Sequence, residues 1–232
     1  MSKPAGIYLF IAVLLVNLAG ILAGSPVLEW ISKPLLVIIL MGIVARNGGR
    51  NYRGLARWLL FALFFSWAGD ILLLFVSLSS SFFLGGLVAF LTAHIFYILL
   101  FHGIRTREGI KPKLLLLVPV LLYYIVFTTF LSPFLGEMKL PVRIYAVVIC
   151  FMLWLALHLL SLQNRGIGLG IATGALLFVI SDSVLAINKF YQPFTGAGVI
   201  IMLTYGLAQL LIVKGTVDFL NKPAALEKTG TK

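Results

Sequence analysis

Long apolar runs, separated by short polar links, follow one another along the whole chain. Most are close to the roughly 20 residues that a helix needs to cross a bilayer, and none alternates in polarity as membrane β-strands do. The links consist of a few glycine, serine, proline or arginine residues, as in RNGGRNYRG and SLSSS. The pattern therefore predicts an all-α fold, a polytopic membrane helical bundle of about eight transmembrane helices. The predicted spans are Ala5–Ala23, Ile31–Ala45, Leu55–Leu78, Phe82–Phe101, Leu114–Leu135, Leu140–Leu162, Gly168–Ile187 and Phe194–Leu220.

Composition leads to the same prediction independently. The 232 residues are 61% hydrophobic and only 11% charged, with a mean hydropathy of +1.10, whereas soluble domains are about a quarter charged. A soluble fold of this size could not bury so much apolar surface. We expect a single transmembrane helical domain over residues 1–222, and the polar stretch NKPAALEKTGTK indicates a short cytoplasmic tail at 223–232.

The 18 basic residues divide unevenly between the two sides of the predicted bundle. With eight spans, fourteen of the 18 fall on one side and four on the other, namely Lys33, Lys139, Arg143 and Lys189. Because basic residues favour the cytoplasmic side, we expect both termini to be cytoplasmic, in an integral protein of a bacterial inner membrane. The division also accounts for the net charge of +11 without nucleic acid as a partner. The first residues resemble a signal peptide too, but only an uncleaved first span preserves the division.

Two of the 7 acidic residues lie inside apolar runs. Asp70 lies within FSWAGDILLLF and Asp182 within LFVISDSVLAI. A carboxylate inside a membrane costs about 2.5–3.5 kcal/mol on insertion scales, so such residues usually have a partner or a task. Counted from the basic ends of their spans, they lie about 18 Å and 21 Å along helices of the same direction. The sequence therefore predicts two carboxyl groups at matching depth, and the similar GDILL and SDSVL segments hint at a four-span duplication.

Other polar side chains fall near the predicted level of the two aspartates. Serine catalysis is disfavoured because the chain has no G-x-S-x-G motif. Tyrosine, glutamine and histidine at this depth also serve as interhelical hydrogen-bonding groups, and lysines near span ends can extend to the interface. These alternatives stay open at this point. The candidates for substrate contacts are Lys33, Asn17, Ser66, His94, Tyr97, Lys189, Tyr205 and Gln209.

A set of short motifs, in order, resembles the lysoplasmalogenase (YhhN-like) family of integral membrane proteins. The resemblance covers the second, third, fourth, seventh and eighth predicted spans, and the other spans contribute mainly hydrophobicity. The motifs are KP at Lys33–Pro34, GDILL from Gly69, the spaced residues Gly85, Phe90, His94 and Tyr97, GALLFVISDSVLA from Gly174, Phe190, and YGLAQLLI from Tyr205.

The resemblance implies hydrolysis of the vinyl ether bond of lysoplasmalogens, with a fatty aldehyde and a glycerophospho-ethanolamine or -choline as products. It implies that Asp70 and Asp182 are the catalytic pair. The reaction needs a protonated acid, because a proton must be added to the β-carbon, and a second carboxylate that activates water, as in glycosidases. We expect the two aspartates to face a shared cavity, with Lys33 near its mouth holding the lipid phosphate.

Neither a metal nor a cofactor is expected. The single cysteine, Cys150, permits no zinc motif, and His94 with scattered carboxylates is a poor metal cage. The expected partners are a lysophospholipid substrate and the lipid bilayer. The alternative function is a lipid or proton-coupled transporter that uses the same aspartates. The sequence does not decide the head group, the acid and base roles or the oligomeric state.

Overall fold

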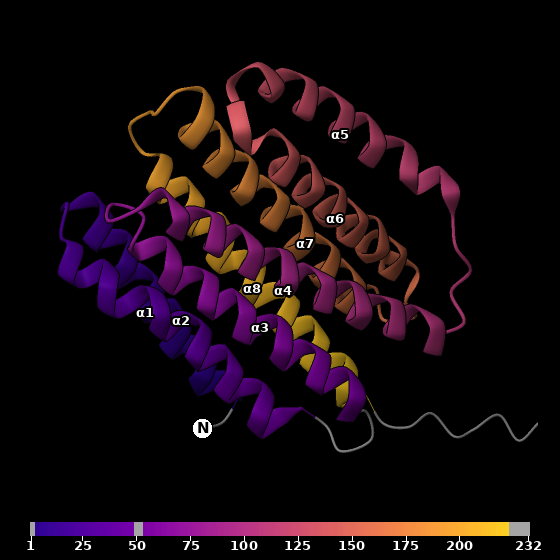
Figure 1. Ribbon diagram of the computed structural model, residues 1–232. Coiled ribbons are helices and arrows are strands. Elements are labelled where there is room, and N and C mark those ends of the chain that lie inside the picture. Colours follow the sequence, from indigo (N-terminus) through magenta and orange to yellow (C-terminus); the bar gives the residue numbers. More distant parts are fainter. Residues whose placement is uncertain (1–2, 49–52, 223–232) are drawn as a thin grey trace, which may run out of the picture.

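Eight long helices make up the described part of the chain, and the prediction of an all-α bundle is confirmed (Figure 1). The computed structural model describes residues 3–48 and 53–222. All eight helices are long and apolar enough to cross a membrane, the fifth when the short turns that flank it are included, over Leu114–Phe134. They are α1 (Lys3–Leu22), α2 (Pro26–Asn47), α3 (Arg53–Leu74), α4 (Ser80–Arg107), α5 (Leu117–Leu131), α6 (Lys139–His158), α7 (Arg165–Ala186) and α8 (Ala197–Leu220).

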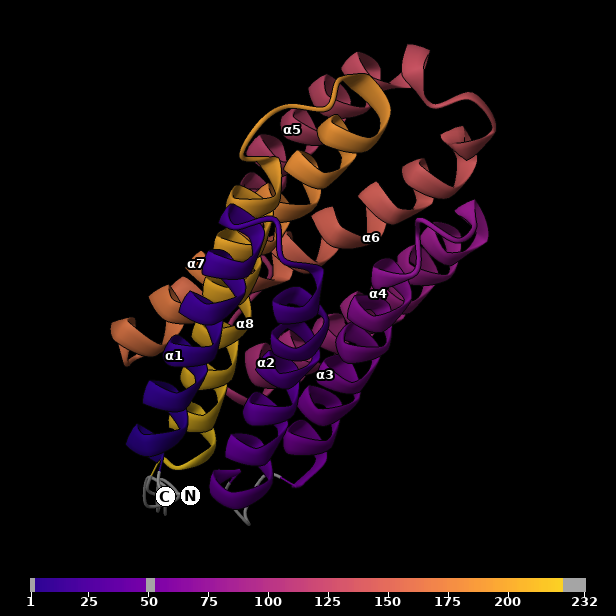
Figure 2. The ribbon, with the colours of Figure 1, turned by 90° about the vertical axis from the view of Figure 1, so that its left-hand side faces the viewer.

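Consecutive helices, with the exception of α4 and α5, pack against each other as antiparallel pairs. The most extensive packing joins α3 to α4 and α7 to α8, and α4 also packs against α6. Helix α8 contacts α1, α2, α3 and α7, so it occupies the centre of the bundle, whereas α5 lies at its edge against α6 (Figures 1 and 2). The aspartate-bearing helices α3 and α7 therefore flank the central α8.

Small residues allow the closest of these helix pairs to form. A side chain at Gly174 in α7 would lie 2.8 Å from the carbonyl oxygen of Ala208 in α8, and one at Gly69 would lie 2.7 Å from the ring of Phe90. Backbones can approach closely where the interface residues are small. Gly69 directly precedes Asp70, so this contact holds the aspartate's part of α3 against α4.

Several span boundaries differ from the sequence prediction by a few residues, and local chemistry explains two of them. Helix α2 begins at Pro26 rather than Ile31, because proline fits the first turn of a helix, where no backbone donor is needed. Helix α3 ends at Leu74 rather than Leu78. Ser79 ends the following turn and caps α4 by accepting a hydrogen bond from the backbone of Ser81. Asp70 consequently lies only about 6 Å, one helical turn, from the end of α3.

We define the distal end of the bundle as the end opposite the N-terminus, where α1–α2, α3–α4, α5–α6 and α7–α8 are joined (Figure 1). Lys33, Lys139, Arg143 and Lys189 belong to the distal parts of their helices or turns, as the sequence predicts. Arg50 and the predicted tail at 223–232 lie outside the described residues. The assignment of the distal end to the outer face of the membrane stays a prediction.

Candidate active site

Asp70 is buried in the distal part of α3, with an exposed fraction of only 1%. The Tyr205 hydroxyl, from α8, donates a hydrogen bond of 2.6 Å to Oδ2 of the carboxylate. The Lys33 ammonium, from α2, lies 3.7 Å from Oδ1. A buried carboxylate needs such a donor and counter-charge, so Asp70 has the neighbours of an ionised group.

Asp182 occupies the equivalent position on α7, four residues before its last residue, as Asp70 does on α3. The Tyr145 hydroxyl, from α6, donates a hydrogen bond of 2.5 Å to Oδ2. The His94 Nε2, from α4, lies 4.0 Å from the same oxygen, which is too long for a direct hydrogen bond. His94 is fully buried, and neither of its ring nitrogens has a hydrogen-bond partner among the described residues.

A chain of hydrogen bonds at the centre of the bundle extends from the Asp70 partner Tyr205 to Tyr97. The Tyr97 hydroxyl of α4 donates to Oε1 of Gln209 in α8, and Gln209 Nε2 donates to the Tyr205 oxygen at 3.3 Å. Ser66, one turn before Asp70, is fully buried beside Tyr97. Hydrogen bonds therefore connect Asp70 to α4 through Tyr205 and Gln209.

The polar contacts cross between the two hairpins. Asp70 lies on the α3–α4 hairpin and is bound by Tyr205 of the α7–α8 hairpin. Asp182 lies on the α7–α8 hairpin and is approached by His94 of the α3–α4 hairpin. Asp70 is thus held by a hydrogen bond from the other hairpin, whereas Asp182 is held by Tyr145 of α6 and is only approached by His94.

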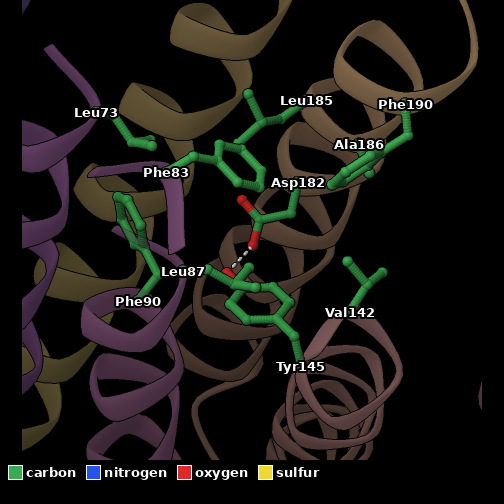
Figure 3. Close-up of a pocket in the computed structure, with 10 residues that line it drawn as sticks. All are labelled: Leu73, Phe83, Leu87, Phe90, Val142, Tyr145, Asp182, Leu185, Ala186 and Phe190. Carbon is green, nitrogen blue, oxygen red and sulfur yellow. Dashed lines mark hydrogen bonds between the residues drawn. The ribbon is translucent and has the colours of Figure 1, made fainter. Parts of the chain in front are cut away.

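A small apolar cavity lies at Asp182 (Figure 3). Its volume is about 50 Å³, enough for a few water molecules but not for a lipid chain. In Figure 3 one carboxyl oxygen of Asp182 meets the Tyr145 hydroxyl and the other points towards Phe83. The other lining residues are all apolar: Leu73, Leu87, Phe90, Val142, Leu185, Ala186 and Phe190.

A larger and more polar cavity of about 390 Å³ adjoins it at the distal end. The two cavities share the lining residues Leu73, Phe83 and Leu185. The polar residues of the larger cavity are Asn17, Glu29, Lys33, Asn188 and Lys189.

The lysines of this larger cavity differ in their contacts. Lys33 reaches down to Asp70, whereas the Lys189 ammonium lies 5.2 Å from the centre of the Phe83 ring. Asn17 donates a hydrogen bond of 2.9 Å to Ser32. Two lysines and one glutamate line the larger cavity, so its charged side chains are net positive, whereas the small cavity is apolar apart from Asp182 and Tyr145.

The structure brings together most of the residues that the sequence selects, in three groups. Asn17, Lys33 and Lys189 line the polar cavity, His94 and Tyr205 approach the aspartates, and Ser66, Tyr97 and Gln209 form the central contact. One expectation needs modification: Asp182 lines the small cavity, whereas Asp70 lies outside its lining and is linked to the adjoining cavity by Lys33.

Tyr145 is the important residue that the sequence reasoning missed. It lies in the sixth predicted span, which contributes mainly hydrophobicity to the family resemblance. In the structure, however, its hydroxyl contacts Asp182 and its ring lines the small cavity. A signal was available, because Tyr145 is only six residues from the start of α6, at about the depth of the aspartates. In the part of the chain that the structure describes, no three His, Cys, Asp or Glu residues are grouped as a metal site.

These features define a class of protein: a polytopic helical membrane protein with two buried carboxyl groups under a cationic mouth. Within that class the family is clear. The chain belongs to the YhhN family, whose model matches residues 28–216. No solved structure matches the chain.

Several relatives carry the name lysoplasmalogenase. Human Lysoplasmalogenase TMEM86B is 37% identical over 61% of this chain and 55% of its own length. TMEM86B of Sus scrofa is 35% identical over 77% of this chain and 69% of its own length. The Lysoplasmalogenase of Mycobacterium bovis is 29% identical over 90% of this chain and 78% of its own length. The chain thus spans little more than half the length of the human relative.

Proposed function

We propose that this protein is a membrane hydrolase that cleaves the vinyl ether bond of lysoplasmalogen-type lysophospholipids. The products would be a fatty aldehyde and a glycerophospho-alcohol. One observation carries the proposal: two tyrosine-bound carboxyl groups lie at equal depth, one in an apolar cavity and one beside a lysine of an adjoining cationic cavity. An amphiphile whose ether joins its head group to its chain matches that division, and the relatives named lysoplasmalogenase support the same activity.

In this proposal Asp182 is the general acid. Its carboxyl group faces apolar side chains, and such surroundings favour the neutral form, which carries the proton. Asp182 gives that proton to the β-carbon of the vinyl ether, and the electron pair of the double bond forms the new C–H bond. The product is an oxocarbenium ion at the carbon bonded to oxygen. Tyr145 holds one carboxyl oxygen and leaves the other directed into the cavity (Figure 3).

Asp70 is the general base. An adjacent ammonium and a hydroxyl donor both favour the ionised form of a carboxyl group. Asp70 takes a proton from the water that attacks the oxocarbenium ion, which gives a hemiacetal. The hydroxyl proton of the hemiacetal passes to the glycerol oxygen as the bond between the carbon and that oxygen breaks, which gives the aldehyde and the neutral alcohol. The proton held by Asp70 restores Asp182 for the next cycle.

The cationic cavity is the proposed site of the phosphate-bearing head group. Its volume of about 390 Å³ lies in the range of ligand pockets. Lys189 and Lys33 supply ammonium groups for the phosphate, and Asn17 and Asn188 supply polar contacts to the glycerol. Lys33 would therefore have two tasks, head-group binding and pairing with Asp70.

The decisive test is aldehyde release from a lysoplasmalogen by purified protein in detergent. Aldehyde from the wild type, none from the saturated ether analogue and a large loss in Asp182→Asn would support the proposal. The transporter alternative predicts no aldehyde, together with lipid or proton flux across sealed vesicles that the aspartate variants lose. Aldehyde release equal in wild type, Asp70→Asn and Asp182→Asn would show that these carboxyl groups are not the acid and base.

A further inference from the structure

A third cavity, of about 250 Å³, lies between the distal parts of α4 and α6. Its lining is apolar apart from one tyrosine hydroxyl: Leu84, Leu87, Val88 and Leu91 from α4, and Leu140, Pro141, Ile144 and Tyr145 from α6. Several of these side chains face outwards, with exposed fractions of 53% for Val88 and 48% for Ile144. In a bilayer this surface faces lipid, so the cavity opens sideways to hydrocarbon.

This lateral cavity adjoins the small cavity at Asp182. Leu87 and Tyr145 line both. They lie on opposite helices, α4 and α6, which pack against each other (Figure 2). Figure 3 shows both residues beneath the carboxyl group of Asp182. Only these two side chains line both cavities. They therefore form the partition between the bilayer-facing lateral cavity and the carboxyl group of Asp182.

We propose that the hydrocarbon chain of the lysolipid occupies the α4–α6 cavity and reaches Asp182 from the side, past Leu87 and Tyr145. This inference rests on the proposed function, because it names where the substrate's chain lies. The occupant is a hydrocarbon rather than a head group, since no charged residue lines the cavity. The lateral cavity adjoins the small cavity at Asp182, and the small cavity adjoins the cationic cavity. This order gives the chain a defined direction, from the cationic cavity towards the bilayer.

The three cavities together define the position of each part of the substrate. The head group lies in the cationic cavity, the vinyl ether passes Leu73 and Phe83 to reach Asp182, and the chain leaves between α4 and α6 into the bilayer. The small cavity, at about 50 Å³, is too narrow for a chain as it stands. The Leu87 side chain must therefore move when substrate enters, which makes it the gate of the lateral path.

The test uses bulky substitutions at the outer rim of the lateral cavity. Val88→Trp and Ile144→Trp place an indole in the cavity without touching Asp70 or Asp182, and both sites are exposed, so the fold should accept them. Val126→Trp on α5 is the matched control, because Val126 is exposed on the lipid-facing surface and lines none of the three cavities. Each variant is assayed with a long-chain lysoplasmalogen and with a soluble analogue that carries a butenyl chain.

We expect both plugs to lower kcat/KM for the long chain by about tenfold or more, because each excluded methylene removes part of the binding energy. Both plugs should lower the turnover of the butenyl analogue much less than that of the long chain, because a butenyl chain is too short to fill the lateral cavity. The Val126 control should match the wild type with both substrates. Equal turnover of the long chain by the plugged variants and the control would overturn the inference.

A second measurement separates this inference from the proposed function. A lysolipid with a diazirine at its chain end should label peptides of α4 and α6 in the wild type and the control. Val88→Trp should lose that labelling. If the wild type releases no aldehyde but shows this pattern, the hydrolase proposal fails while the lateral lipid site stands. Labelling confined to other helices would refute the site whatever the catalytic result.

Discussion

Tyr145→Phe is the variant that tests the site most directly, because it removes a single oxygen atom. The Tyr145 hydroxyl donates to Asp182 Oδ2 at 2.5 Å, and its ring lines the cavities on either side of the lateral partition. Phenylalanine keeps the ring and the partition but leaves the carboxyl group free to rotate. We therefore expect a fall in kcat with little change in KM, since binding of the chain depends on the ring.

The size of the effect follows from the bond that is lost. Asp182 becomes a carboxylate as it gives up its proton, and a hydrogen bond to a charged group contributes about 1.5–3 kcal/mol. Each 1.36 kcal/mol in the barrier is tenfold in rate. If the bond acts mainly on the catalytic position of Asp182, kcat should fall by roughly 10- to 150-fold. The loss should stay smaller than that of Asp182→Asn, which removes the acid itself.

The assay is steady-state aldehyde release, combined with thermal unfolding of each purified variant. Tyr123→Phe is the matched control: the Tyr123 hydroxyl is 2.5 Å from Ser183 Oγ, on the residue after Asp182, but it is not bonded to the carboxyl group. That control should lose comparable stability and keep its kcat. If Tyr145→Phe keeps the wild-type kcat, or if Tyr123→Phe loses as much, the assignment of Tyr145 as a positioning residue for the acid is wrong.

Three further predictions follow from the same geometry. Asp70→Asn and Asp182→Asn should each lower aldehyde release by about 10²–10⁴-fold or more, which is the usual contribution of acid–base catalysis. Both variants should be extracted from membranes like the wild type. Retained activity in either variant would remove that residue from the mechanism. Lys33→Met should lower the melting temperature and kcat, because breaking a buried ion pair typically costs about 3–5 kcal/mol. Lys33→Arg should retain most of the stability and most of the activity. A Lys33→Met variant with unchanged melting temperature and kcat would show that the ion pair is not needed. In a Cys150→Ser background, Gly24→Cys should react with an impermeant thiol reagent outside the cell and Glu108→Cys should not, and the reverse result would invert the predicted orientation.

Much of the fold could be predicted because the bilayer sets a length. A span must be about 20 apolar residues, so eight runs of that size predict eight helices almost independently of their detailed packing. The boundaries were less certain, since apolar residues continue into turns. Leu78, for example, belongs to the turn after α3 rather than to the helix. The serines that close this turn are chemically informative, but they lie beyond the apolar run that defined the span.

The aspartates could be selected from sequence because the cost of a carboxyl group in hydrocarbon makes an accidental one rare. Their partners could not be selected with the same certainty. Lys33 was expected to bind a phosphate at the interface, and its contact with Asp70 depends on how α2 packs beside α3. Tyr145 was missed because a tyrosine in an apolar run has no comparable insertion cost, and only the packing of α6 against α7 gives it a role.

The crossed arrangement explains why two similar hairpins form one asymmetric site. Tyr97 and Gln209 each follow their own hairpin's aspartate by 27 residues, and they meet in one hydrogen bond at the bundle centre. The neighbours of the two carboxyl groups differ. Asp70 lies beside a lysine from α2, a helix outside both hairpins. Asp182 lies beside a tyrosine and a histidine, and no lysine or arginine among the described residues is within ion-pairing distance of it. Hydrolysis by acid and base needs two carboxyl groups in opposite protonation states at one moment. In the proposed mechanism the one added cation, Lys33 on α2, would favour the ionised form of Asp70 over that of Asp182 and so distinguish the base from the acid.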